Sequence, residues 1–151
     1  DQKITRLAYQ VYENNFEEKE ILICGIAGRG FILAKKLATR LREISSFRIE
    51  EAEISLNKEN PAGTRASLTP SINTRDKTVI LCDDVLYTGR TMAYAAIPFL
   101  IEGVRKLQCL VLIHRNHLHF PIQPNFIGLA LATTLHEHVQ VDFDKGTVSL
   151  S

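Results

Sequence analysis

Three segments of the chain repeat apolar residues every three or four positions, which is the period of an amphipathic helix. The sets are Ile4, Leu7, Ala8 and Val11; Ala34, Leu37, Ala38 and Leu41; and Met92, Ala95, Ala96, Phe99 and Leu100. Pro98 lies inside the third set, so we expect a kink or a local distortion of that helix, because proline lacks an amide hydrogen. The pattern therefore predicts three helices.

Short apolar runs separate these helices, as expected for strands that are buried on both faces. The runs cover residues 21–24, 79–82 and 107–113, with another strand expected within 47–56, shorter ones at 126–131 and 139–143, and a turn at 144–146 that leads into 148–150. Strands that alternate with helices favour the α/β class, with a mainly parallel twisted sheet flanked by helices and antiparallel strands at its C-terminal edge. We expect a single domain over residues 1–151.

Residues 57–76 form a long polar stretch that contains Pro61, Gly63 and Pro70. At about 20 residues, the stretch is longer than connections in compact domains usually are without a function of their own. It is therefore a candidate active-site loop.

The composition narrows the class of protein. Of the 151 residues, 45% are hydrophobic and 23% are charged, and the formal net charge of +1 gives no global reason to expect nucleic-acid binding. Cys24, Cys82 and Cys109 lack CxxC spacing and lie in apolar runs, which indicates buried reduced thiols. No apolar stretch approaches the roughly 20 residues that cross a bilayer, and no signal-peptide pattern is present, so we expect a soluble cytoplasmic protein.

Two carboxylates, Asp83 and Asp84, directly follow the apolar run at 79–82. In an open parallel sheet, ligands bind outside the carboxyl ends of the strands, so these side chains are expected where a substrate would lie. Adjacent carboxylates repel each other, and sugar hydroxyls or a magnesium complex would relieve that repulsion.

Residues 88–91 read Thr-Gly-Arg-Thr and begin the third predicted helix. Two hydroxyls, a glycine that tolerates positive φ and the unpaired amides of a helix N-terminus are the parts of an anion site. Carboxylates for a diol and amides for a phosphate, a few residues apart, match the two ends of one ribose 5-phosphate. Taken singly, each piece is explained as well by a solvated turn and an ordinary N-cap.

The run VILCDDVLYTGRT at 79–91 resembles the phosphoribosyl pyrophosphate (PRPP) signature of type I phosphoribosyltransferases. Residues 25–30, with the predicted helix that follows at 31–38, look like the pyrophosphate loop of that family. Residues 110–117 and 120–128 are similar to one branch, the pyrimidine operon attenuation regulators that are also uracil phosphoribosyltransferases. The resemblance covers nearly the whole chain, and it implies the type I phosphoribosyltransferase fold with a small C-terminal hood over the base.

The resemblance also implies a role for each matching residue. These are Asp83, Asp84, Arg29 and Lys58 in catalysis; Tyr87, Thr88, Gly89, Arg90 and Thr91 at the 5-phosphate; Ala27, Gly28, Arg29 and Gly30 at the pyrophosphate; and Arg115, Phe126 and Ile127 at the base. Mg²⁺ is implied as a cofactor bound through PRPP and pyrophosphate, not in a separate protein metal site. A homodimer or a higher homo-oligomer is implied as well.

By the same resemblance, a base nitrogen attacks C1 of PRPP and magnesium-bound pyrophosphate leaves, so that uracil yields uridine monophosphate. Such a reaction depends on orientation and charge neutralisation more than on a nucleophilic side chain. The chain departs from the usual pattern of the branch in three places: residues 27–28 replace Lys-Thr, residues 57–60 replace an arginine followed by two aspartates, and His114 replaces an acidic residue.

Other functions are weighed against this one. The glycine order at 25–30 does not match a dinucleotide fingerprint, and no P-loop sequence is present. The three histidines between 114 and 119 lack an accompanying cysteine or acidic cluster, so a polar rim to the base pocket is favoured over a metal site. The alternative function is a non-catalytic or weakly catalytic, nucleotide-sensing regulator that binds pyrimidine leader RNA, with solvated helix faces as the simpler interpretation of the basic residues. Those residues are Arg6, Lys35, Lys36, Arg40 and Arg42.

Overall fold

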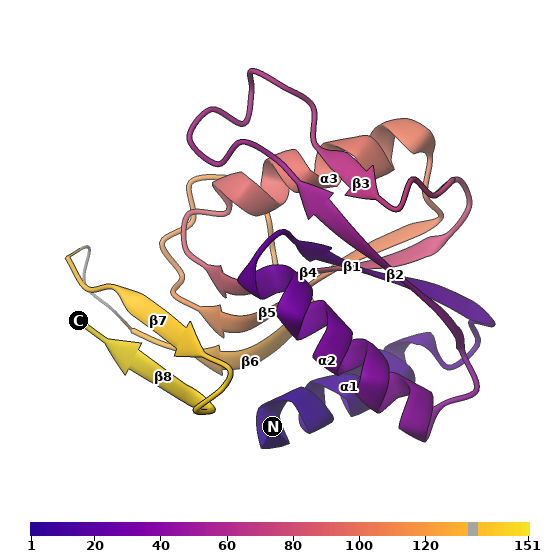
Figure 1. Ribbon diagram of the computed structural model, residues 1–151, viewed down its shortest axis with the longest axis horizontal. Coiled ribbons are helices and arrows are strands. Elements are labelled where there is room, and N and C mark those ends of the chain that lie inside the picture. The colour runs from indigo at the N-terminus through magenta and orange to yellow at the C-terminus, as the bar shows by residue number, and fades with distance from the viewer. Residues whose placement is uncertain (133–135) are drawn as a thin grey trace.

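The structure, a computed structural model, describes residues 1–132 and 136–151, in which helices and strands alternate (Figure 1). The helices are α1 (Gln2–Asn15), α2 (Arg29–Ile44) and α3 (Arg90–Glu102). The strands are β1 (Glu20–Ile26), β2 (Arg48–Ser55), β3 (Ser67–Thr69), β4 (Thr78–Leu86), β5 (Lys106–His114), β6 (Phe126–Ala130), β7 (Val139–Asp142) and β8 (Thr147–Leu150). Each predicted helix and strand is thus present, and α3 continues through Pro98.

Six strands form one sheet in the order β3-β2-β1-β4-β5-β6. All neighbouring pairs in it are parallel except β2 and β3, which are antiparallel. The strand order reverses at β1, because β2 continues the sheet on one side and β4 on the other. A reversal of this kind leaves a crevice at the carboxyl ends of the two central strands, where open α/β sheets usually bind ligands.

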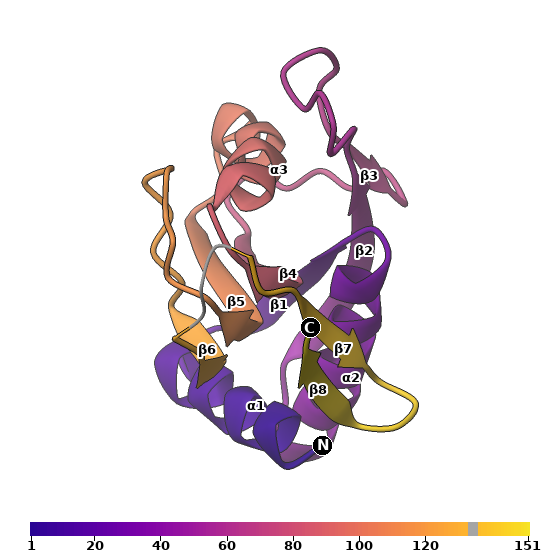
Figure 2. The same cartoon turned by 90° about the vertical axis from the view of Figure 1, so that its left-hand side faces the viewer.

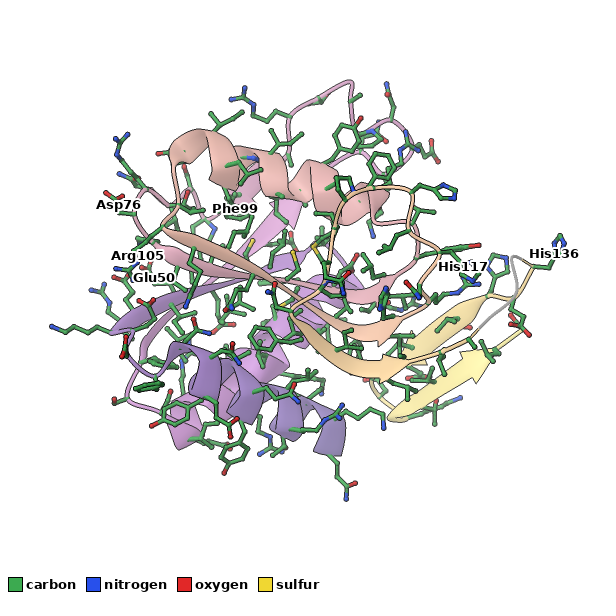
Figure 3. The ribbon with its side chains drawn as sticks, turned by 180° about the vertical axis from the view of Figure 1, so that it is seen from behind. Glu50, Asp76, Phe99, Arg105, His117 and His136 are labelled. Atoms are coloured by element: carbon green, nitrogen blue, oxygen red, sulfur yellow. The ribbon has the colours of Figure 1, made fainter. Side chains whose placement is uncertain are left out.

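The helices cover both faces of the sheet, with α1 and α2 on one face and α3 on the other (Figure 2). Leu37 and Ile80 belong to the core under α1 and α2. Leu81 and Phe99 belong to the core under α3, and Figure 3 shows Phe99 between that helix and the sheet. Because neighbouring residues of β4 enter opposite cores, the strand has an unbroken apolar sequence in place of alternation.

The antiparallel strands are arranged differently from the prediction. β7 and β8 do pair antiparallel, but they form a separate two-stranded sheet, and the main sheet ends at β6, which is parallel to β5. Val141 of β7 is buried in the core under α1 and α2, so packing against that layer holds the hairpin. The antiparallel edge strand is β3, within the stretch 57–76 that the sequence predicts to be a loop.

The three cysteines are buried and form no disulfide, as predicted. Burial, together with the charge of Glu53, raises the pKa of the Cys24 thiol to about 12, and burial raises that of Cys109 to about 11. These two thiols therefore stay protonated and unreactive at neutral pH. None of the helices in the described ranges is long and apolar enough to cross a membrane.

Candidate functional site

The glycine-rich loop after β1 and the acidic pair on β4 lie side by side at the reversal point of the sheet. Gly25 is the register partner of Cys82, so the residues that follow these two positions are neighbours. A Cβ atom on Gly30 would lie 2.9 Å from Oδ1 of Asp83 and 2.9 Å from the carbonyl oxygen of Cys82. Only a residue without a side chain allows the first turn of α2 to approach the carboxylate so closely. The two segments that the sequence assigns to pyrophosphate and ribose therefore meet.

Asp83 is the buried member of the acidic pair, with 6% of its surface exposed, whereas Asp84 is half-buried. The Asp84 amide donates a hydrogen bond to Oδ1 of Asp83 at 2.9 Å, and the Val85 amide donates to Oδ1 of Asp84 at 2.8 Å. Burial, followed by the charge of Asp84, raises the pKa of Asp83 to about 8, while the charge of Lys58 opposes this rise. Asp83 is therefore largely protonated at neutral pH, and the site favours a ligand that brings positive charge to the acidic pair.

The turn at 87–91 joins β4 to α3 and presents the N-terminus of that helix. Gly89 has a φ of 85°, in the left-handed region, and its carbonyl accepts from the Ala93 amide at 2.9 Å. The Arg90 amide donates to Oγ1 of Thr88 at 3.3 Å. The first turn of α3 carries no acidic side chain, so its amides and the helix dipole favour an anion.

The hood segment after β5 closes over this turn. The amides of His119 and Phe120 both donate to the carbonyl of Thr88, at 2.9 and 3.2 Å. A Cβ atom on Gly89 would touch side-chain atoms of Leu118, Phe120 and Ile122 at 3.4–3.6 Å. The backbone of the phosphate turn is therefore held by its own helix on one side and by the hood on the other.

A cavity of about 500 Å³ lies beside the hood, at the ends of β5 and β6. Its walls are formed by His114, Arg115, Asn116, His117, Ala130, Leu131 and Ala132. His114 is only 6% exposed, and its Nε2 has no hydrogen-bond partner among the residues that the structure describes. Burial lowers the pKa of His114, so the ring is neutral at pH 7. A neutral imidazole offers a ligand one donor and one acceptor, which suits the polar edge of a nucleobase.

The remaining predicted site residues do not all lie together in the structure. Arg29 begins α2 and is exposed, as is Lys58 beyond the end of β2, so both cations are accessible from solvent. Gly28 has a φ of 92° and precedes α2. Phe126 is 3% exposed in the core under α1 and α2, while Ile127 packs toward the opposite core, so these two side chains do not gather at the cavity.

One feature of the site has no signal in the sequence. The guanidinium of Arg115 lies over the ring of Tyr87, 4.0 Å from its centroid, and the His117 ring centroid lies 5.1 Å from that of Tyr87. This stack lies at the opposite end of the sheet from Glu50 and Arg105, as the position of His117 shows (Figure 3). Because the stack joins residues that are distant in sequence, only the pairing of β4 with β5 brings it together.

Comparison with known proteins agrees with this geometry. The model of the phosphoribosyl transferase domain family matches residues 1–144. The chain therefore belongs to the type I phosphoribosyltransferase family. Among its curated relatives, the bifunctional protein PyrR of Pediococcus pentosaceus is 33% identical, with 91% of this chain and 84% of that protein covered. The bifunctional protein PyrR of Brevibacillus brevis is 37% identical, with 91% and 82% covered.

Solved structures show the same fold at lower identity. The hypoxanthine phosphoribosyltransferase of Trypanosoma cruzi superimposes with a TM-score of 0.78 at 13% identity, covering 95% of this chain and 83% of that chain. A hypoxanthine-guanine phosphoribosyltransferase of Bacillus anthracis gives a TM-score of 0.72 at 19% identity, covering 86% and 75%. The predicted fold class and family are thus confirmed.

Proposed function

We propose that the protein transfers the phosphoribosyl group of PRPP to a pyrimidine base, and that uracil is the base, giving uridine monophosphate and pyrophosphate. The observation that carries the proposal is the contact between the pyrophosphate loop and the acidic pair, where Gly30 lies directly against Asp83. The phosphate turn at 87–91 directly follows β4 and leads into α3, at the same end of the sheet. One extended ligand can therefore bridge all three segments.

Each part of PRPP has a matching partner in this arrangement. The carboxyl oxygens of Asp83 and Asp84 accept hydrogen bonds from the ribose hydroxyls, since a carboxyl group keeps acceptor lone pairs in either protonation state. The 5-phosphate is bound by the amides at the N-terminus of α3 and the hydroxyls of Thr88 and Thr91. The pyrophosphate lies along the start of α2, where Arg29 is exposed. The division of charge agrees with the ligand, which is anionic at both ends and carries hydroxyls in the middle.

The transfer itself needs little from nucleophilic side chains. A base nitrogen forms a bond to C1, the bond from C1 to the pyrophosphate oxygen breaks with its electron pair, and the base nitrogen loses its proton to solvent. Arg29 and Lys58 lower the energy of the leaving pyrophosphate by neutralising its charge. The carboxyl oxygens of Asp83 and Asp84 would help to hold the magnesium ion that PRPP brings, since Mg²⁺ prefers oxygen ligands. When bound, that ion adds charge neutralisation of the pyrophosphate.

The base is proposed to occupy the cavity beside the hood. His114 supplies a neutral polar group there, and the walls from Ala130 to Ala132 are apolar enough to accept the faces of a flat ring. The choice of uracil rests on the similarity of residues 110–128 to the uracil branch of the family.

Release of pyrophosphate tests the proposal. Purified protein is incubated with PRPP, Mg²⁺ and, separately, uracil, cytosine, hypoxanthine, guanine and adenine. We expect release with uracil and loss of at least about 99% of the rate in Asp84→Asn, because a removed transition-state contact costs several kcal/mol. Asp76→Asn is the matched control: Asp76 is exposed with a φ of 58°, which asparagine tolerates. Release with hypoxanthine alone would overturn the choice of base, and no release with any base would overturn the activity.

RNA binding is the second candidate function, and one observation favours it. α1 and α2, the two helices on which these basic residues lie or near which they fall, are together on one face of the sheet (Figure 2). Against it, Arg40 pairs with Glu43 at 3.1 Å, Arg42 pairs with Glu51 at 2.7 Å, and Arg6 donates to the Gly128 carbonyl. A gel shift with a pyrimidine leader RNA in excess non-specific RNA, at stated salt, decides it. Lys35→Glu with Lys36→Glu should abolish a true complex.

A further inference from the structure

Arg115 joins three separate parts of the site. Its amide donates to the carbonyl of Leu86 at the end of β4, at 2.9 Å. Its guanidinium lies over the ring of Tyr87 in the phosphate turn, with Cζ 4.0 Å from the ring centroid. Its Nη2 donates to the carbonyl of Glu137 at 2.6 Å, just before β7. Only 7% of the residue is exposed.

These contacts suit a guanidinium and no other common cation. The group is planar, so one face can stack on an aromatic ring while the edge donates hydrogen bonds in the same plane. A buried cation also needs such partners, because burial without them is unfavourable. Lysine would keep the charge but lose the stacking plane, and it would direct its donors from a single tetrahedral nitrogen.

The partners of Arg115 belong to parts of the site with different proposed ligands. Tyr87 precedes the threonines and amides that bind the 5-phosphate, whereas Glu137 leads into the hairpin of β7 and β8. The side chain lies between them and lines the wall of the base cavity. One planar guanidinium therefore contacts both the Tyr87 ring and the Glu137 carbonyl.

We propose that Arg115 is a positioning residue that couples the phosphate turn to the C-terminal hairpin, so that binding of the sugar phosphate further stabilises the hairpin beside the base. The inference rests on the proposed function, because it takes the ligand of the phosphate turn from it. It gives Arg115 a role that differs from the direct base contact that the family resemblance implies.

Hydrogen exchange with ribose 5-phosphate as the probe tests the link. In the wild-type protein, saturating ligand should slow amide exchange both at residues 88–91 and in β7, by at least about threefold in the hairpin, since local opening responds to local stabilisation. In Arg115→Lys, the slowing at 88–91 should remain at saturation while the slowing in β7 disappears. Arg75→Lys, at an exposed arginine between β3 and β4, should behave as the wild type.

A second pair of variants tests the same coupling by changing Tyr87 in place of Arg115. Tyr87→Leu removes the ring under the guanidinium and should abolish the slowing in β7, whereas Tyr87→Phe keeps the ring and should preserve it. In steady-state assays, Arg115→Lys combined with Tyr87→Leu should raise the KM for PRPP no more than the larger single change does, because both remove one coupling. Independent roles for Arg115 and Tyr87 would instead give additive effects and would contradict the coupling.

The outcomes separate the two proposals. If ribose 5-phosphate gives no protection at 88–91 in the wild type, the proposed function fails and the coupling fails with it. If protection at 88–91 is present but exchange in β7 is unchanged in the wild type, or is slowed equally in Arg115→Lys, the coupling alone is overturned. A rise in the KM for the base with an unchanged KM for PRPP in Arg115→Lys would likewise favour direct base contact and contradict it.

Discussion

The sugar-phosphate half of the site and the base half are assembled in opposite ways. The first is nearly continuous in sequence, because Asp83 to Thr91 runs from the end of β4 into α3. The glycine-rich loop after β1, the neighbour of β4 in the sheet, completes it. The second combines the end of β5, the hood, the end of β6 and Glu137, two residues before β7. Local backbone geometry fixes the first half, whereas long-range packing fixes the second.

This difference predicts which half tolerates change. The phosphate half depends on glycines at close backbone approaches and on a buried carboxylate, so small substitutions there should have large effects. The base half depends on side chains around a cavity, where a substitution changes the fit of one ligand and leaves the backbone in place. The three predictions that follow compare the halves, from the largest expected effect to the smallest.

Gly30→Ala should have the largest effect. The new methyl group would lie 2.9 Å from the Cys82 carbonyl, which is backbone inside the central strand and cannot move aside. We expect the free energy of unfolding in urea to fall by about 2–3 kcal/mol, as overpacking does. Gly63→Ala is the control, because its methyl group would meet the end of the flexible Asn60 side chain. Equal stability of the two variants would contradict the close approach of α2 to β4.

Asp83→Asn should change how stability depends on pH. The pKa of Asp83 is about 8 in the folded protein, whereas the ordinary pKa of an aspartate carboxyl is 3.8, so the folded state binds the extra proton between these values. Its contribution to stability is complete below about pH 4 and is lost as the pH rises toward 8. As the pH rises from 5 to 7, the free energy of unfolding of the wild type should fall by on the order of 2 kcal/mol more than that of Asp83→Asn. Parallel curves in chemical unfolding would show that Asp83 is ionised throughout.

Thr88→Ala and His114→Leu should have the smallest effects, and on different constants. Thr88→Ala removes a hydroxyl at the phosphate turn and should weaken ribose 5-phosphate binding by about fivefold, near 1 kcal/mol, with the KM for the base unchanged. His114→Leu should raise the KM for the base and leave ribose 5-phosphate affinity unchanged. It should not destabilise the fold, since it removes a buried nitrogen that has no partner among the described residues. The comparison of the halves fails if both variants alter the same constant.

The same contrast explains which parts of the fold and of the site can be predicted from the sequence alone. The apolar runs and helical repeats predict the elements of the sheet, and the run at 79–91 predicts where the acidic pair and the phosphate turn lie, because both are local patterns. The sequence does not predict that β7 and β8 leave the main sheet, since this depends on Val141 packing under α1 and α2. Nor does it predict the stack of Arg115 on Tyr87, which exists only because β4 pairs with β5.

The central claim is that a pair of carboxylates and a neighbouring helix N-terminus bind opposite ends of one sugar phosphate. Calorimetric titration of the wild type and Asp84→Asn with ribose 5-phosphate and with inorganic phosphate tests this directly. We expect the wild type to bind ribose 5-phosphate at least about tenfold more tightly than inorganic phosphate, since two charge-assisted hydrogen bonds exceed 1.4 kcal/mol. Asp84→Asn should remove that preference and leave the affinity for inorganic phosphate unchanged. Equal affinities for the two ligands in the wild type, or a parallel loss of both in the variant, would contradict the claim.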